Sequence, residues 1–234
     1  MKTLFYRPFA FALSVAALLT FATVAAAQTK SPLLNTIELK KLVTSDAPAD
    51  HARLHAHFVA LADRYVADAR RHEAMAQAYV GNRNPGLVTT MRNHCTQLKD
   101  LATRSAAILR DVAAYHDKLA AGAPATLPAG ASRFEAGEGT PGPTEKELAA
   151  LATNAKAAAD HKALEEYFLT EAKRHAAEAD TDAALALMYR SQPSGRPHPE
   201  FASNFDRLET LERQTAAQAT AAAQMHKDLA GVAR

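Results

Sequence analysis

The sequence lacks the features that would place it in a class of proteins at once. Tryptophan is absent and Cys95 is the only cysteine, so no disulfide can form within the chain and stability has to come from packing. There is no Cys-x-x-Cys-His for covalent haem, no glycine-rich phosphate loop, no Gly-x-Ser-x-Gly and no His-Glu-x-x-His. No motif therefore indicates a reaction.

Long hydrophobic runs are also missing once residues 1–27 are set aside. These residues carry two basic side chains near their start, continue as an uncharged apolar run from Phe9 to Val24 and end in three alanines. This is the pattern of a secretory signal peptide. We expect cleavage before Gln28 and a periplasmic or secreted protein; an uncleaved membrane anchor is the alternative.

The mature chain would have no net charge, because 25 basic and 25 acidic residues remain after the two basic residues of the signal are removed. A neutral chain offers no basic surface for nucleic acid, and no later apolar run suits stable membrane insertion. Its 207 residues are enough for one domain with a sizeable core. Helical faces could still contact a protein partner or a second copy of the chain.

What the chain does contain is an internal repeat. Residue i matches residue i+110 without a gap over residues 50–120, and 19 of these 71 positions are identical. The dipeptide Asp50-His51 returns as Asp160-His161, and His116 returns as His226. We infer a tandem duplication.

Helix and turn signals predict an all-α fold of two helical hairpins in one domain. The expected segments are a lead with a short helix (28–47, helical over 33–43), the first hairpin repeat (48–121), a Gly/Pro-rich linker (122–144) and the second hairpin repeat (145–232). In the first hairpin the turn is 81–86. In the second, one helix is expected to run from 145 to 190, because no proline matches Pro48, and 191–199 forms the turn.

These hairpins predict an up-down-up-down four-helix bundle. Its seam is indicated by residues that recur every seven positions and so keep to one line of a supercoiled helix. They are Phe58, Tyr65, His72 and Tyr79 in the first repeat, and Phe168, His175, Asp182 and Tyr189 in the second.

Histidines provide the main candidate site. In an antiparallel hairpin with its turn near residues 83 and 84, His51 lies level with His116, and by duplication His161 lies level with His226. An up-down-up-down bundle would bring all four to the same end. Together with the residues one turn further along, they predict a transition-metal site for Cu, Zn or Ni, with haem b as a second choice, made of His51, His55, His116, His161, Glu165 and His226. Two other interpretations stay open, a structural hydrogen-bonded cluster and a pH-responsive one.

Two further patterns are present on the helices. His72, His94 and Cys95, with nearby methionines, form a weaker second candidate site that would suit a soft ion such as Cu(I), although core packing is the favoured explanation. Residues 171, 175, 178 and 182 are Glu, His, Glu and Asp at spacings of four, three and four, which resembles in outline the ligand positions of di-iron bundles. The first repeat does not share this pattern, so we interpret it as a solvated charged face.

The sequence thus favours an exported helical bundle that binds a metal ion or small cofactor for binding, storage or sensing rather than catalysis. The alternative is a structural or interaction protein of the cell envelope that has no ligand.

Overall fold

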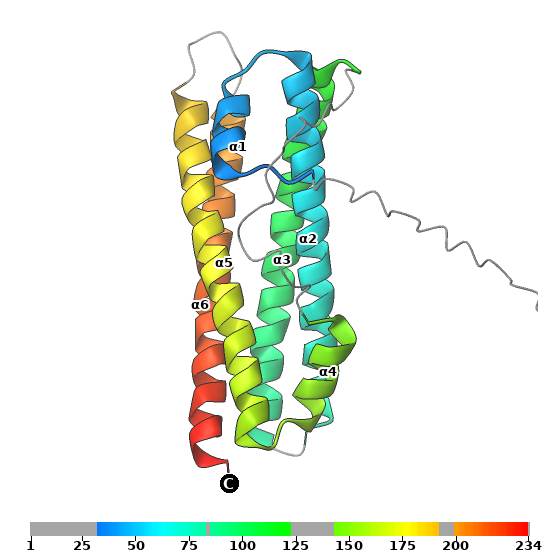
Figure 1. The fold of residues 1–234 in the computed structure, drawn as a ribbon, viewed down its shortest axis with the longest axis vertical. Coiled ribbons are helices and arrows are strands. Elements are labelled where there is room, and N and C mark those ends of the chain that lie inside the picture. The colour runs from blue at the N-terminus through cyan, green and yellow to red at the C-terminus, as the bar shows by residue number, and fades with distance from the viewer. Residues whose placement is uncertain (1–31, 83–84, 123–142, 192–198, 234) are drawn as a thin grey trace, which may run out of the picture.

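The computed structural model describes residues 32–82, 85–122, 143–191 and 199–233, and this part of the chain contains helices and no strands (Figure 1). The predicted signal peptide, most of the linker and most of the second turn lie outside the described residues. The helices are α1 (Thr36–Val43), α2 (Pro48–Val80), α3 (Pro85–Ala120), α4 (Glu145–Asn154), α5 (Ala158–Arg190) and α6 (Pro199–Val232). The all-α prediction is confirmed.

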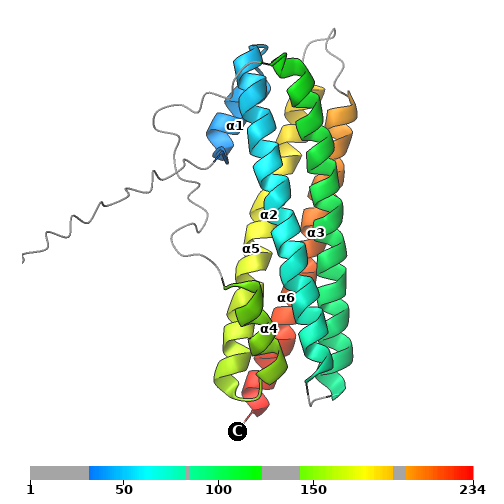
Figure 2. The ribbon, with the colours of Figure 1, turned by 90° about the vertical axis from the view of Figure 1, so that its right-hand side faces the viewer.

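The direction of the four long helices differs from the prediction. They lie side by side, with α2 and α6 running one way and α3 and α5 the other (Figure 1). α5 therefore begins at the end of the molecule opposite to the end of α3, and α4 lies at the end where α5 begins (Figure 2). The up-down-up-down order was wrong, because it requires α5 to begin at the end of the molecule where α3 finishes, and α5 begins at the other end.

The helix predicted over 145–190 is interrupted at residues 155–157, which separate α4 from α5. Asp160 explains why α5 begins here although no proline is present. Its Oδ2 accepts the backbone N–H groups of Lys156 and Ala157, both at 3.1 Å, so it satisfies donors that a helix start leaves unpaired. Asp160 thus lies in the first turn of α5, as Asp50 does in α2.

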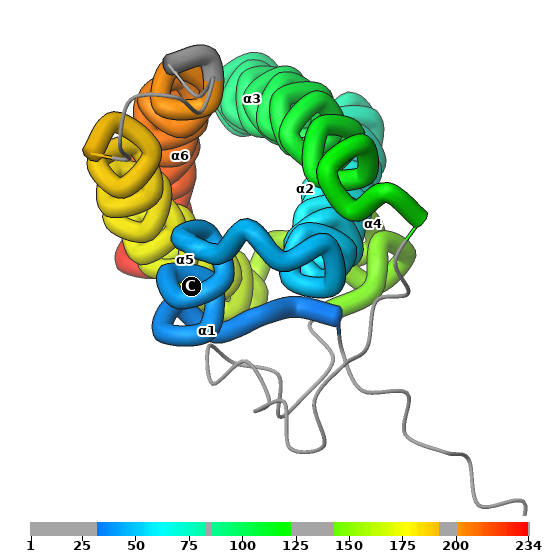
Figure 3. The backbone as a smooth tube through the Cα atoms, turned by 90° about the horizontal axis from the view of Figure 1, so that it is seen from above, coloured from blue at the N-terminus to red at the C-terminus, as the bar shows by residue number. Residues whose placement is uncertain are grey.

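The two short helices take equivalent places in the two halves. Each starts at a capping box, Asn35 with Glu38 in α1 and Thr144 with Glu147 in α4. Both α1 and α4 contact α2 and α5, at opposite ends of the molecule (Figure 2). Seen from above, α1 lies over α2 and α5, on the side away from α3 and α6 (Figure 3).

The core consists of two apolar clusters. One lies near α1 and includes Leu34, Phe58 and Phe205; the other lies near α4 and includes Tyr79 and Phe168. All eight residues of the predicted seam are buried, so the sevenfold spacing located the inner face of α2 and α5 correctly. No helix among the described residues combines the length and apolar character needed to cross a membrane.

The start of α5 can be tested by replacing Asp160 with alanine. We expect a loss of about 1 kcal/mol in the free energy of unfolding, because two backbone N–H groups lose their acceptor. Denaturant unfolding of the variant measures it. Asp111→Ala, an exposed change within α3, is the matched control and should change stability little. Equal values for the two variants would contradict the capping role.

Candidate functional site

The histidines of the main candidate site form two pairs. His51 Nδ1 lies 3.1 Å from His116 Nδ1, and His116 Nε2 lies 3.1 Å from the hydroxyl of Tyr189. In the other half, His161 Nδ1 lies 3.1 Å from His226 Nδ1, and His226 Nε2 lies 2.9 Å from the hydroxyl of Tyr79. The two halves therefore make the same three-residue arrangement.

These pairs lie at opposite ends of the molecule rather than at one level. His161 and Tyr189 belong to the same helix, α5, and the 28 residues that separate them correspond to about 42 Å at 1.5 Å per residue. The prediction that the four histidines converge was wrong, because α5 is antiparallel to α2. Each end offers two imidazoles and a phenol.

The end pairs are suited to holding helices together. Burial lowers the pKa of His51 and of His161, and burial together with His161 lowers the pKa of His226 to about 3, so these rings are neutral at neutral pH. His55 donates from Nδ1 to the Ala113 carbonyl, at 3.0 Å. Among the described residues, no group of three close ligand atoms includes any of these histidines or Glu165.

The second candidate site is not assembled either. Cys95 is fully buried in the apolar cluster near α4, and burial raises the pKa of its thiol to about 12. His94 is directed to α6, where its Nδ1 lies 2.8 Å from Gln218 Oε1. His72 is buried and stacks against Phe168. A protonated thiol is a poor metal ligand, so core packing explains these residues.

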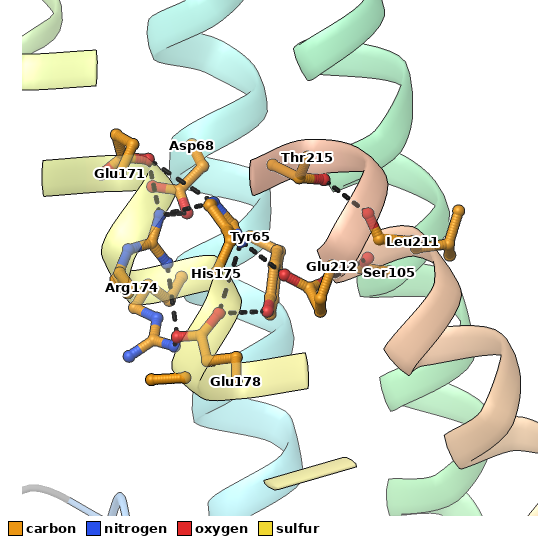
Figure 4. Close-up of polar contacts among 12 residues, drawn as sticks. Tyr65, Asp68, Ser105, Glu171, Arg174, His175, Glu178, Leu211, Glu212 and Thr215 are labelled. Carbon is orange, nitrogen blue, oxygen red and sulfur yellow. Dashed lines mark hydrogen bonds and ion pairs between the residues drawn. The ribbon is translucent and has the colours of Figure 1, made fainter. Parts of the chain in front are cut away.

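The pattern on α5 that we interpreted as a solvated face is instead buried. The exposed fractions of Glu171, His175 and Asp182 are 8%, 1% and 8%, and the Glu178 side chain is 12% exposed. The side chains of Glu171, His175 and Glu178 lie on the side of α5 that faces α2 and α6 (Figure 4). The solvated-face interpretation was wrong, because it ignored that His175 and Asp182 belong to the predicted seam.

Two ion pairs connect α2 to α5 at this level. Arg64 of α2 contacts Glu178 of α5, and Arg174 of α5 contacts Asp68 of α2 with Nη2 and Oδ2 2.8 Å apart. Positions 64 and 174 are equivalent in the repeat, as are 68 and 178, so the pairs are reciprocal. No Cα atom of α2 comes within 8 Å of one in α5, and long side chains bridge this separation.

Two groups of three potential ligands share His175, which lies between them. In the first group, Asp68, Glu171 and His175, the space between the ligand atoms is taken by the protein's own cation. Arg174 Nη2 lies 2.8 Å from Asp68 Oδ2, 2.6 Å from Glu171 Oε2 and 3.0 Å from His175 Nε2. A metal ion could enter this group only by displacing Arg174.

The second group, His175, Glu178 and Glu212, offers one ligand atom from each residue within 4.8 Å of the others. His175 Nδ1 is hydrogen-bonded to Glu212 Oε2 and lies 3.5 Å from Glu178 Oε2. The other oxygen of Glu212 accepts the hydroxyl of Ser105 at 2.8 Å, and Tyr65 donates its hydroxyl to Glu178. Such supporting hydrogen bonds hold ligands in place around metal ions.

Electrostatics keeps this group charged. Burial and Arg174 oppose a charge on His175, but Glu171 and Glu212 favour it more strongly and raise the pKa of His175 to about 9. Burial disfavours a charged Glu178, yet Arg64 and Arg174 hold the pKa of this carboxyl below its usual range. Burial and the nearby Glu212 and Glu178 raise the pKa of Asp182 well above its usual range.

One imidazole nitrogen and two carboxylates form a ligand set suited to Zn and other first-row transition ions. Sequence reasoning missed Asp68, Ser105 and Glu212 as parts of the site. The repeat gave no signal for Glu212, because Ala102 occupies the equivalent position. A usable signal was present on α5, where charged residues fall on the predicted seam. In comparisons with known proteins, the chain matches no protein family, no curated protein and no solved structure.

The charge on His175 predicts a pH-dependent stability. A folded-state pKa of about 9 exceeds the ordinary 6.5, so the contribution, about 3 kcal/mol, is complete below pH 6.5 and is lost as the pH rises through 9. Denaturant unfolding between pH 6 and 10 measures it. Glu212→Gln removes the main partner of His175, so this variant should be less stable than the wild type at pH 6. Its free energy of unfolding should also decrease less than that of the wild type as the pH rises above 6. The same decline in both proteins would contradict the charge assignment.

Proposed function

We propose that the protein is exported and binds one transition-metal ion in the middle of its helices, through His175 Nδ1, Glu178 and Glu212. Its role would be binding, storage or sensing rather than catalysis. One observation carries the proposal: three ligand atoms from α5 and α6 lie within 4.8 Å of one another in a buried place. Export is supported by the signal pattern of residues 1–27, and an N-terminus at Gln28 in the protein recovered from cells would test it.

We also propose that the chain is a four-helix bundle made by duplication of a hairpin with its preceding short helix. The reciprocal ion pairs, the equivalent histidine pairs at the two ends and the two capped short helices support this origin. Under this proposal the repeat-related histidines hold the ends of the bundle, and the metal lies where the two halves meet.

Metal binding must compete with a proton. Removing the proton from His175 at pH 7 costs about 3 kcal/mol for a pKa near 9. Structural zinc sites gain roughly 10 kcal/mol or more, so the cost lowers the affinity without preventing binding. Affinity should therefore increase with pH up to about 9.

The alternative is a structural protein of the cell envelope that has no ligand. Its supporting observation is that Arg174 already lies between Asp68, Glu171 and His175, where a cation would bind. Under this alternative the cluster is a closed set of ion pairs, and chelators leave the melting temperature unchanged.

Metal content decides between the two proposals. We expect mature protein that is incubated with Zn, Co, Ni or Cu and then desalted to retain about one ion per chain for at least one metal. Glu212→Gln should retain less than about a tenth of an ion, because the site loses a charged ligand. The measurement is elemental analysis with protein quantification.

The matched control is the double variant His51→Ala with His161→Ala, which removes imidazoles at both ends and leaves the central site intact. It should retain the ion. Wild-type content below about a tenth of an ion for every metal, or loss of the ion in the double variant alone, would refute the central site.

A further inference from the structure

A cavity of about 40 Å³ lies between α1, α2 and α5, and of the candidate metal ligands its wall includes Glu178 but not His175 or Glu212. Its walls are mainly apolar and include Leu34, Leu39, Phe58 and Leu185. At roughly 10 to 15 Å³ for each water, the space would hold about three waters or an organic molecule of similar size.

His57 is a polar residue of the cavity wall, and one of its ring nitrogens lacks a partner. His57 belongs to α2 and is 3% exposed, and its Nδ1 accepts the backbone N–H of Leu34 at 3.0 Å. An accepting Nδ1 places the proton of the neutral ring on Nε2. Burial and Arg64 lower the pKa of His57 to about 3, so the ring is neutral. Nε2 is buried and has no hydrogen-bond partner, and it therefore offers a free N–H donor.

The charges on the cavity wall select against ionic ligands. Arg64 and Glu178 both line the cavity and pair with each other, so neither is free to balance a charged ligand. An anion would meet the carboxylate of Glu178, and a cation would meet Arg64 and the N–H of His57. Burying an unpaired charge is costly, so a neutral molecule is favoured.

Water fits this cavity poorly. A buried water typically makes about three hydrogen bonds, whereas most of the wall is apolar and His57 supplies one unpaired donor. A molecule with one acceptor and an apolar part would pair the donor and cover the leucine and phenylalanine side chains. Replacing poorly held water with an apolar group increases affinity.

We propose that the cavity under α1 binds a small neutral molecule of about four non-hydrogen atoms, an amide, ketone or alcohol, whose oxygen accepts the Nε2–H of His57. The cavity shares Glu178 with the proposed metal site, but binding here needs no metal ion. For so few atoms the dissociation constant should be near about 1 mM.

The test is a titration of uniformly ¹⁵N-labelled mature protein with acetamide, followed through the imidazole Nε2–H signal of His57 and the backbone amide signal of Leu34, which the His57 variant also has. We expect a saturable shift for acetamide and none for acetate, which has the same shape but carries a charge. Leu185→Phe, which fills the cavity, and His57→Phe, which removes the donor, should each weaken binding at least about tenfold.

Leu187→Phe is the matched control, because Leu187 lies on the same helix as Leu185 but is 64% exposed. It should bind acetamide as the wild type does. The wild-type titration decides the question even if a variant fails to fold. No saturable shift with acetamide, which would mean that the cavity holds water only, would overturn the proposal, as would an unchanged affinity in folded Leu185→Phe.

Discussion

The fold depends on two reciprocal ion pairs buried between α2 and α5. Arg64 contacts Glu178 and Arg174 contacts Asp68, and Arg174 Nη1 also lies 3.5 Å from Glu178 Oε1, so the four charges form one network. A buried charge without a partner would cost several kcal/mol, so both pairs have to form together. Long side chains need room, and this explains why the backbones of α2 and α5 stay apart while α1 and α4 each contact both helices.

The ion pairs between α2 and α5 also separate the two apolar clusters of the core and position the carboxylates of the candidate site. Apolar clusters lie toward α1 and toward α4, and the charged side chains lie between them. Asp68 and Glu178, which the arginines hold, lie around His175 together with Glu171 and Glu212. Arg174 fills one side of that imidazole, and on the other side Nδ1 faces the carboxylates of Glu212 and Glu178. The protein's own cations therefore decide which of the two ligand groups can bind.

Sequence patterns predicted much of this structure. Turn residues and apolar spacing gave the helices, and the sevenfold spacing identified the buried faces of α2 and α5. The break before α5 was missed because we looked for a proline, although Asp160 provides the same start by accepting backbone N–H groups. The direction of α5 could not be predicted, because the sequence of the linker does not indicate at which end of the molecule α5 begins.

The candidate site was missed for a different reason. On α5 the sevenfold spacing predicted buried side chains, whereas the charges of the same residues predicted exposed ones. The sequence of this helix alone does not decide between the two predictions. The charged side chains of α5 can be buried because Arg64 and Asp68 of α2 and Glu212 of α6 pair with them. These partners lie far away in the sequence. Pairing across helices is a tertiary property, so the conflict itself was the usable sign of a buried polar site.

The central claim is that His175 is a charged, carboxylate-held imidazole that exchanges its proton for a metal ion. The most direct measurement is an NMR titration of the His175 ring nitrogens without metal and with one equivalent of Zn. We predict a pKa of about 9 without metal and no titration of Nδ1 with zinc. An ordinary pKa near 6.5 that zinc leaves unchanged would contradict the account.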